Sequence, residues 1–573
     1  MRHLRLHDDS SEWSVNAEGL PRRSGRWSAY AVVLFAYCLL LALSASEDPG
    51  DTRDYANSIA QRFANRDLSF WEAGHLFWRP LGYLVVLFAR HADAPISAAV
   101  FYAHVVHSLT AMSVVMGAVA LLAFLAWAQR CGIATIPAVG ATLALATTCA
   151  FLNYAQTGAA YVSSLAMFMV GLWALETVDA RAQWRDIASP LAFSICVLFW
   201  LPMMFSVPVA AASPLILRGD SRRRRNAAAW TCVLSGALVV AAYLAVAEIK
   251  HIHSIVEFRH WLNDASHGIE NSGGLSRTAI GLARSVVSTG QLGITAKRFL
   301  LHDSYSPATA ADVVRAGLYR VAIFYGALGI LSYSLARKRQ SARVFAFLVL
   351  GAIPVLAFAV AWQGGDLERY FPIFPALFLA IGVALSALQR EYGVLAAVVM
   401  VALLAAFNIP EYSRTRATRT CAELESRLHS VTASNRTHTL IVTMGADELS
   451  SFRGRCPDAR ELEQPDAPGV VGIFTPHSAD GTHWREFFAK RALDEWRSGG
   501  RVLISSGLLA ERPPAQWHWA EGDDPRVSWG EFPAFFDSLA TTGSRGDART
   551  FLEVLPSAAN EAALERERRE PAR

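Results

Sequence analysis

A series of apolar runs, separated by short polar breaks, extends from Ser28 to about Pro410 and constrains the fold more than any other feature of the sequence. A run of roughly 20 apolar residues is long enough to cross a bilayer as a helix, and a helix satisfies its backbone hydrogen bonds without water. The chain is 53% apolar and 18% charged, which is more apolar and less charged than an average soluble domain. From Glu411 onward no run approaches the required length. The sequence therefore predicts an α-helical polytopic membrane protein with a soluble C-terminal domain.

About eleven stretches are candidates for membrane spans. The pair around Pro202 and Pro208 is the least regular, because its apolar stretch is long for one helix and short for two. One long kinked helix is the alternative, and it would move everything downstream to the other side of the membrane. The candidate spans cover residues 28–45, 97–127, 134–152, 157–176, 188–203, 204–217, 227–247, 315–335, 344–362, 371–388 and 393–409.

Positive charge decides between these two topologies, because cytoplasmic loops carry the excess of Lys and Arg. With eleven spans, the main basic groups all fall on the side of the N-terminus. These groups are Arg22, Arg23 and Arg26, then Arg130, Arg181 and Arg185, then Arg218 and Arg222–Arg225, then Arg337, Lys338, Arg339 and Arg343, and finally Arg390. The pattern predicts a cytoplasmic N-terminus on an uncleaved first span, and a C-terminal domain outside the cytoplasm.

The first outer loop, residues 46–95, carries polar groups close to the membrane surface. Residues 51–66 are predicted to form a short amphipathic helix, with Tyr55, Ile59 and Phe63 four residues apart. Arg79-Pro80 then precedes an apolar run of about ten residues, which is too short to span and fits an interfacial helix. One interpretation is a catalytic carboxylate that deprotonates an acceptor hydroxyl or amine at the membrane boundary.

A simpler interpretation of the same loop is structural. Asp51 or Thr52 would cap the helix, and Glu72 would be solvated near His75. The local sequence taken alone favours this second interpretation.

The second outer loop, residues 250–314, is rich in histidine. Its polar and aromatic residues include His251, His253, Phe258, His260, Trp261, Asp264, His267 and Lys297. A metal site is one interpretation. The spacing favours interfacial side chains instead, with Trp261 as an anchor at headgroup depth.

Several short elements then follow one another in a recognisable order. They are Asp51 with Tyr55 and Ala60, the run Arg79-Pro80-Leu81-Gly82-Tyr83, the turn Phe151–Gln156 with Tyr161, the proline-containing stretch Phe199–Ser213, and Glu368-Arg369-Tyr370-Phe371-Pro372 with Pro375. This order resembles the GT-C glycosyltransferases, membrane enzymes that use a lipid-linked sugar, and within them the bacterial branch related to aminoarabinose and protein mannosyl transferases. The family often has an Asp-Glu or Asp-x-Asp pair at the acidic position of the first outer loop, where this chain has Asp51-Thr52-Arg53-Asp54, and the usual His-Pro-Pro element is absent. The choice between Asp51 and Asp54 as the acidic residue therefore stays open.

The resemblance implies an inverting glycosyltransferase that moves a sugar from a polyprenyl-phosphate-linked donor to a glycan, lipid or protein acceptor of the cell envelope. Asp51, with Asp54 as the substitute, would be the general base. Arg369 and Tyr370 would bind the donor phosphate, with Lys297 as an alternative cation. The acceptor site would include Glu72, His75, Arg79, Tyr154 and Gln156.

Several consequences of this assignment concern location and partners. The chain would lie in a bacterial inner membrane with its C-terminal domain in the periplasm, and no feature indicates nucleic-acid binding. No metal-ligand pattern is identified, although the resemblance leaves Mg²⁺ or Mn²⁺ open. Glu368 precedes Arg369 directly, and a structural ion pair between them fits the sequence as well as a phosphate-binding role for Arg369 does. A transporter or flippase, or a non-catalytic scaffold of an envelope assembly, stays an alternative to transfer.

The C-terminal domain, residues 411–560, is predicted to be a small α/β unit. Strands are expected at residues 438–444, 470–474 and 502–505, with a helix at 484–496, and this alternation favours a partly parallel sheet. Cys421 and Cys456 are the only cysteines in this part, and we expect them to form a disulfide in an oxidising compartment. The domains before it are a cytoplasmic segment 1–27 and a transmembrane domain 28–410. The charged tail 561–573 is expected to be disordered.

Overall fold

The structure is a computed structural model of the whole chain. It describes residues 23–45, 51–52, 55–56, 58–59, 62, 70–89, 98–176, 185–264, 274–290, 292–300, 308–337, 339–412, 439–443, 469–472, 484–510, 530–542 and 551–569.

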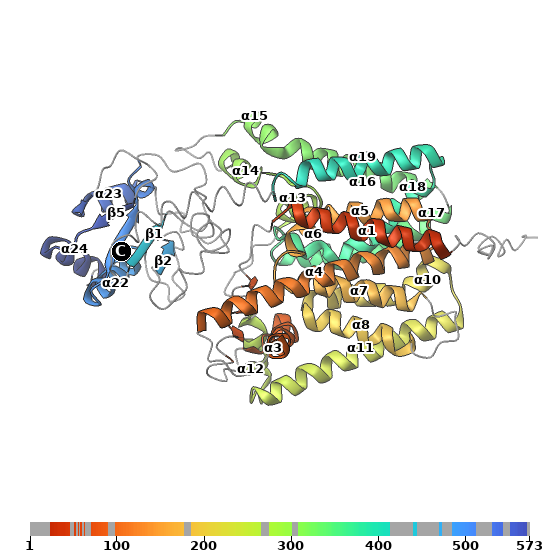
Figure 1. Cartoon of the computed structure of the whole chain (residues 1–573), viewed down its shortest axis with the longest axis horizontal. Coiled ribbons are helices and arrows are strands. Elements are labelled where there is room, and N and C mark those ends of the chain that lie inside the picture. Colours follow the sequence, from red (N-terminus) through yellow and green to blue (C-terminus); the bar gives the residue numbers. More distant parts are fainter. Residues whose placement is uncertain are drawn as a thin grey trace, which may run out of the picture.

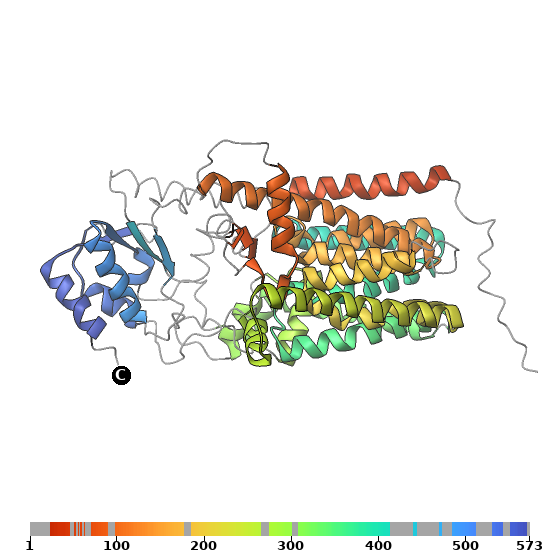
Figure 2. The ribbon, with the colours of Figure 1, turned by 90° about the horizontal axis from the view of Figure 1, so that it is seen from below.

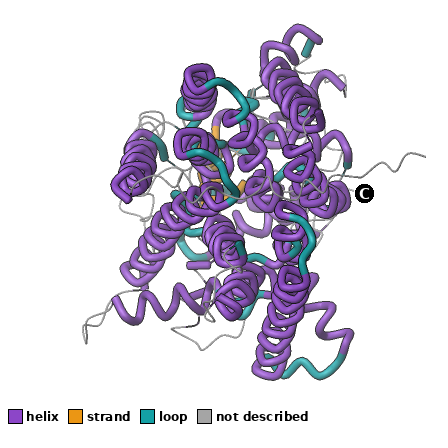
Figure 3. The backbone as a smooth tube through the Cα atoms, turned by 90° about the vertical axis from the view of Figure 1, so that its right-hand side faces the viewer, coloured by secondary structure: helices purple, strands orange, loops and turns teal. Residues whose placement is uncertain are grey.

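The described part of the chain up to residue 412 is a bundle of helices, seen from the side in Figures 1 and 2 and along its length in Figure 3. Six helical stretches within it are long and apolar enough to cross a membrane, and five shorter apolar helices accompany them. The prediction of a polytopic helical membrane protein is therefore confirmed. The main helices are α1 (Arg23–Leu43), α4 (Ala98–Arg130), α5 (Thr135–Ala146), α6 (Cys149–Tyr154), α7 (Tyr161–Leu175), α8 (Arg185–Phe199), α11 (Arg222–Ile249), α16 (Tyr319–Arg337), α17 (Arg339–Ala361), α18 (Phe374–Ser386) and α19 (Arg390–Asn408).

The segment between α8 and α11 crosses the bundle, but it is not one continuous helix. It consists of three short pieces, η4 (Leu201–Phe205), α9 (Val207–Ala211) and α10 (Ser213–Arg218). Each piece has a proline in its first two positions, where the missing N–H costs nothing. Pro202, Pro208 and Pro214 thus restart the helix three times, so the stretch 204–217, predicted as one span, consists mainly of the two short helices α9 and α10.

Short helices gather at one end of the bundle, the end nearer to the C-terminal domain in Figures 1 and 2. They are η3 (Ala73–His75), α3 (Trp78–Ala89), α12 (Ile255–Asp264), α13 (Leu275–Val286), α14 (Leu292–Leu300), α15 (Ala310–Val313) with η5 (Val314–Leu318), and η6 (Leu367–Ile373). We call this the loop end. The helix predicted after Arg79-Pro80 is α3, and its 12 residues make it as short as expected. The start of α1 lies at the opposite end of the bundle, which we call the N-terminal end.

Asn408, the last residue of α19, ties three segments together at the loop end. Its amide nitrogen donates to the carbonyls of Thr147 and Val286, at 2.6 and 2.8 Å. Its oxygen accepts the N–H of Ser288 at 2.8 Å. The side chain is fully buried, so these bonds satisfy polar groups that water cannot reach.

The C-terminal domain contains a five-stranded sheet in the order β2-β1-β3-β5-β4. The three predicted strands are present as β1 (Thr439–Thr443), β2 (Gly469–Gly472) and β3 (Arg501–Ser505), and β1 pairs in parallel with both neighbours. The predicted helix is α22 (Trp484–Arg497). The sequence did not reveal the antiparallel strands β4 (Thr541–Thr542) and β5 (Phe551–Val554), which extend the sheet beyond β3.

The tail was predicted wrongly as far as Arg569. Helix α24 covers Ala558–Arg569, and Leu564 is fully buried in the core that the domain builds around Trp484. Glu565 forms ion pairs with Arg497, Arg568 and Arg569. Charged composition indicated disorder, but charges of opposite sign three and four residues apart support a helix.

Candidate active site

Asp51 lies at the beginning of the helical residues of the first outer loop and contacts the start of α7. Its carboxylate Oδ2 accepts a hydrogen bond from the hydroxyl of Tyr161 at 2.5 Å. Next to it, Thr52 is buried, and its hydroxyl accepts the N–H of Gly158 at 2.8 Å. Both side chains therefore hold the first loop against the turn between α6 and α7, and Asp51 stays partly exposed.

Two tyrosine rings connect Asp51 to the element around Arg369. The rings of Tyr161 and Tyr154 meet edge to face, with centroids 4.8 Å apart. The hydroxyl of Tyr154 donates to Glu368 Oε2 at 2.7 Å, and Glu368 Oε1 lies 3.8 Å from Nε of Arg369. Residues that are more than 300 positions apart in the chain thus form one continuous line of contacts, from Asp51 through Tyr161, Tyr154 and Glu368 to Arg369. We call these five residues the carboxylate–tyrosine line.

Arg369 is the cation at the far end of this line. Its side chain is 12% exposed, and its Nη2 donates to Gln363 Oε1 at 2.5 Å and lies 3.7 Å from Asp366 Oδ2. Its Nε is buried and has no hydrogen-bond partner among the described residues. The guanidinium therefore keeps donor capacity while its position is fixed from the Nη2 side.

Tyr370, predicted to bind the donor phosphate with Arg369, has a different role. It is fully buried, and its hydroxyl contacts the carbonyls of Thr278 and Gly364 at 2.8 and 2.6 Å. Helix α13 approaches Gly364 so closely at Gly281 that a side chain there would collide with the Gly364 carbonyl. The Tyr370 hydroxyl thus fixes η6 to α13 and is not available to a phosphate.

Three other predicted residues, Glu72, His75 and Arg79, lie beside the carboxylate–tyrosine line. Arg79 forms an ion pair with Glu72 at 2.5 Å, and both side chains are less than 10% exposed. The Arg79 guanidinium also lies over the ring of Tyr55, 5.1 Å from its centre. The His75 ring contacts Tyr55 and Tyr161, with centroids 5.3 and 5.6 Å away.

The tautomer of His75 follows from its one polar partner. Its Nδ1 lies 2.8 Å from the carbonyl oxygen of Phe199. A carbonyl can only accept, so Nδ1 carries the proton of this hydrogen bond and the neutral ring keeps Nε2 as an acceptor. Burial lowers the pKa of His75 more than the nearby Glu72 carboxylate raises it, so the ring is neutral at neutral pH.

This shift predicts how acid affects stability. Because the pKa of His75 is lower in the folded state than in the unfolded state, the unfolded chain binds more protons once the pH falls below about 6.5. We expect the thermal midpoint to fall between pH 6.5 and 5, and to fall less in His75→Gln. The control is the exposed His260→Gln, which should follow the wild type. An unchanged pH profile in His75→Gln would show that His75 does not titrate as described.

The buried pair of Glu72 and Arg79 makes a second prediction. Arg79→Met leaves the Glu72 carboxylate buried without its cation, which costs about 3–5 kcal/mol. A second substitution, Glu72→Gln, should recover most of this loss in thermal unfolding. Arg497→Met removes a half-exposed guanidinium and should change the midpoint little. Equal midpoints for Arg79→Met and Arg497→Met would contradict the burial of the pair.

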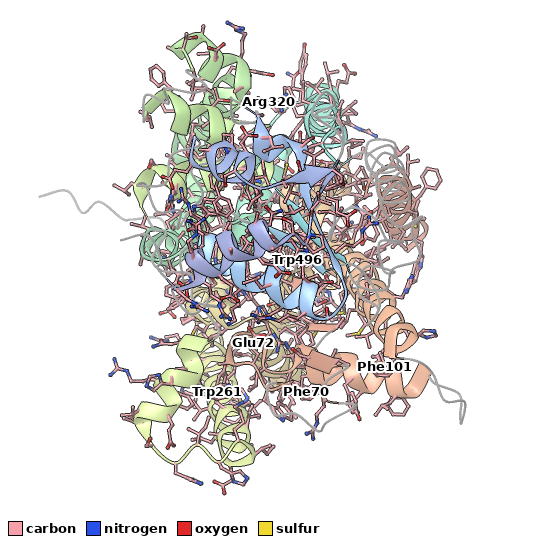
Figure 4. The ribbon with its side chains drawn as sticks, turned by 90° about the vertical axis from the view of Figure 1, so that its left-hand side faces the viewer. Phe70, Glu72, Phe101, Trp261, Arg320 and Trp496 are labelled. Atoms are coloured by element: carbon pink, nitrogen blue, oxygen red, sulfur yellow. The ribbon has the colours of Figure 1, made fainter. Side chains whose placement is uncertain are left out.

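Contacts from α11 and α12 hold the segment that carries Glu72 and His75. The Tyr243 hydroxyl donates to the Ala73 carbonyl at 2.5 Å, and the Trp261 indole donates to the Trp71 carbonyl at 2.9 Å. Figure 4 shows Trp261, Phe70 and Glu72 in the same part of the loop end. The prediction that Trp261 is a headgroup anchor was wrong, because the side chain is 6% exposed and packs on the first outer loop.

The remaining predicted residues lie apart from the line or outside the described residues. The Gln156 amide donates to the Ser44 hydroxyl and to the Leu152 carbonyl, so it joins α6 to the end of α1. Asp54, Cys421 and Cys456 lie outside the described residues, and the side chain of Lys297 in α14 does too. The role of Asp54 and the disulfide stay predictions.

The described residues include no group of three or more His, Cys, Asp and Glu side chains placed to hold a metal ion. In the second outer loop, the rings of His251 and His253 are 6.3 Å apart. His260 is exposed on α12, and His267 lies outside the described residues.

Two residues of the line were not among the predicted site residues. Tyr161 was noted only as part of the turn after α6, and Glu368 only as a partner of Arg369. Glu368 could have been identified from its position, because a carboxylate at the edge of an apolar span is costly and usually functional. Nothing in the sequence indicates that the Tyr161 hydroxyl points to Asp51.

Comparison with known proteins gives matches only among solved structures. No protein-family model matches the sequence, and no curated protein sequence matches it. The chain is similar to the crystal structure of ArnT from Cupriavidus metallidurans bound to undecaprenyl phosphate, with a TM-score of 0.47 and 13% identity over 94% of this chain and 99% of that chain. The apo crystal structure of the same protein gives a TM-score of 0.47 and 13% identity over 93% of this chain and 98% of that chain. These neighbours are of the GT-C class that the order of sequence elements resembles.

Proposed function

We propose that the chain is a membrane glycosyltransferase that moves a sugar from a polyprenyl-phosphate-linked donor to an acceptor hydroxyl or amine of the cell envelope. The observation that carries this proposal is the carboxylate–tyrosine line. It joins a partly exposed carboxylate, Asp51, to a fixed guanidinium, Arg369, at the loop end of a membrane bundle. Sugar transfer from a lipid phosphate needs a base for the acceptor and a cation for the leaving phosphate.

In the proposed reaction the acceptor attacks the anomeric carbon of the sugar. One bond forms between the acceptor oxygen or nitrogen and this carbon, and the bond between the carbon and the phosphate oxygen breaks. The acceptor proton goes to the Asp51 carboxylate, and the electron pair leaves with polyprenyl phosphate. A single displacement of this kind inverts the configuration at the anomeric carbon.

Arg369 would hold the phosphate of donor and product. A guanidinium binds two phosphate oxygens at once, and the buried Nε of Arg369 has no other hydrogen-bond partner among the described residues. The Gln363 contact at Nη2 supports this role, because a side chain that is already ordered loses little entropy when it binds.

Asp51 would act as the base because it is the carboxylate of the line that stays partly exposed. Glu368 is less suited, since it is buried between Tyr154 and Arg369. His75 would orient the acceptor through Nε2, and the pair of Glu72 and Arg79 would shape that part of the site.

The proposal includes the orientation of the chain in the membrane. The basic groups next to the spans support a cytoplasmic N-terminus, and the N-terminal and loop ends of the bundle lie opposite each other (Figure 1). The loop end and the C-terminal domain would then face the periplasm of a bacterial inner membrane. The domain limits given above, with the C-terminal domain extended to Arg569, stay part of this proposal.

The test measures release of free polyprenyl phosphate, which does not require a known acceptor chemistry. Membranes that contain the chain are supplied with a panel of polyprenyl-phosphate-linked sugars and with envelope extract as acceptor. The proposal expects release that depends on the chain, on the extract and on one sugar. Passage of intact donor across the bilayer without release would indicate a flippase, and a folded chain that cleaves none of the donors would indicate a scaffold.

A further inference from the structure

The end of the bundle opposite the candidate active site carries a group of guanidinium side chains around the turn from α10 to α11. We call this group the arginine cluster. Its members are Arg218, Arg222, Arg223, Arg224, Arg225 and Arg343. None of them belongs to the site proposed for sugar transfer.

Two of these side chains converge on Gly219, the residue that follows α10. Arg224 Nη1 donates to the carbonyls of Arg218 and Gly219, both at 3.1 Å. Arg343 reaches the same turn from α17, with both Nη atoms 3.5 Å from where a side chain of residue 219 would begin. Gly219 has a φ of +88°, a conformation that favours glycine, so the turn keeps its backbone open to both guanidinium groups.

Two members of the cluster have ion-pair partners that the described residues show. Arg218 pairs with the buried Glu176, and Arg225 pairs with the exposed Asp220. The first turn of α11 contains no acidic residue, and no described carboxylate pairs with Arg343. Four arginines at the positive end of a 28-residue helix repel both one another and the helix dipole. A bound anion would offset this repulsion.

The position of the arginine cluster relative to the membrane indicates which kind of anion it binds. Trp230 on α11 is 51% exposed, and Trp27 at the start of α1, at the same end of the bundle, is 75% exposed. Tryptophan is enriched at the boundary between lipid and water. Arg222 precedes Trp230 by about 12 Å along the helix, at 1.5 Å per residue, so the start of α11 lies on the water side of the level that Trp230 marks. Exposed apolar side chains then continue along α11 at Val233 and Val240.

We propose that the arginine cluster binds the phosphate headgroup of an anionic phospholipid in the leaflet at the N-terminal end of the bundle. Clusters of four or more arginines beside a membrane span attract anionic lipids. The lipid phosphate would lie beside Gly219, between the start of α11 and Arg343, and its acyl chains would follow the apolar face of α11. This binding does not depend on the function proposed above.

The test uses the full chain in detergent and counts bound lipid by native mass spectrometry. Phosphatidylglycerol is the anionic probe, and phosphatidylcholine with the same acyl chains is the neutral one. The test variant carries Arg222→Gln, Arg223→Gln and Arg343→Gln, all at exposed positions. The matched control carries Arg491→Gln, Arg566→Gln and Arg569→Gln, which remove the same charge from exposed positions of the C-terminal domain.

We expect the dissociation constant for phosphatidylglycerol to rise about fivefold for each cluster arginine removed, or about a hundredfold in the test variant. The control should bind like the wild type, and phosphatidylcholine should bind weakly to all three. Equal phosphatidylglycerol binding by the test variant and the control would overturn the proposal. Displacement of phosphatidylglycerol by an equal concentration of inorganic phosphate would also overturn it, because the site would then select free phosphate.

Discussion

Replacing Asp51 with asparagine should lower the rate of sugar transfer by about two to four orders of magnitude, the usual contribution of a general base. Asparagine keeps the size of the side chain and an oxygen that can accept the Tyr161 hydroxyl, which lies 2.5 Å from the carboxylate. The substitution therefore removes the base and leaves the contacts of the first outer loop in place. Release of polyprenyl phosphate by membranes with equal amounts of protein measures the effect.

The matched control for this prediction is Asp54→Asn, three residues further along the same loop. We expect this variant to keep its rate within about tenfold of the wild type, because such a change would be small beside the loss of a general base. The opposite result, with Asp54→Asn inactive and Asp51→Asn active, would exchange the two roles. Full activity in both variants would contradict any role for this loop as a base.

Replacing Arg369 with glutamine should lower the rate by about 10²–10³, the loss seen when a group that stabilises developing negative charge is removed. The single substitution has a second effect. It leaves Glu368, whose side chain is 7% exposed, without the guanidinium beside it, and breaking a buried ion pair costs up to about 3–5 kcal/mol. Loss of activity in this variant alone would therefore not separate catalysis from folding.

The double variant Glu368→Gln/Arg369→Gln separates the two effects. The glutamine at position 368 keeps an oxygen for the Tyr154 hydroxyl, and it removes the charge that Arg369 compensates. We expect a thermal midpoint close to that of the wild type, together with the same loss of transfer as in Arg369→Gln. If the double variant recovers both stability and transfer, Arg369 is a structural partner of Glu368 and does not bind the donor.

The sequence predicted the membrane architecture better than the details of individual elements. Length and apolarity of the runs are sufficient to identify helices such as α4 and α11, because the bilayer sets the required length. The breaks between η4, α9 and α10 were not predicted, although the three prolines were visible. Each proline fits the start of a helix and also fits a kink inside one, and only packing decides between these outcomes.

The sequence identified the acidic and basic residues of the candidate site, but it did not reveal the contacts between them. Asp51 and Arg369 were predicted through the family resemblance, whereas the local sequence around Asp51 favoured a capping role. Tyr154 and Tyr161, which connect them, are seven residues apart in the chain, and the sequence does not reveal which carboxylate each hydroxyl reaches. The role of Tyr370 could not be predicted from its position in the chain. It follows Arg369 directly, and yet its hydroxyl contacts α13.

Binding of polyprenyl phosphate to the purified chain tests most directly whether Arg369 holds the donor phosphate while Asp51 acts on the acceptor. Titration of the wild type, Asp51→Asn and Glu368→Gln/Arg369→Gln separates binding from chemistry. We expect the wild type and Asp51→Asn to bind equally well, because Asp51 acts on the acceptor. The double variant should bind roughly tenfold or more weakly, since a hydrogen bond to a charged group contributes about 1.5–3 kcal/mol. Equal binding by all three proteins, or no binding by the wild type, would contradict the assignment of this site to a lipid-phosphate donor.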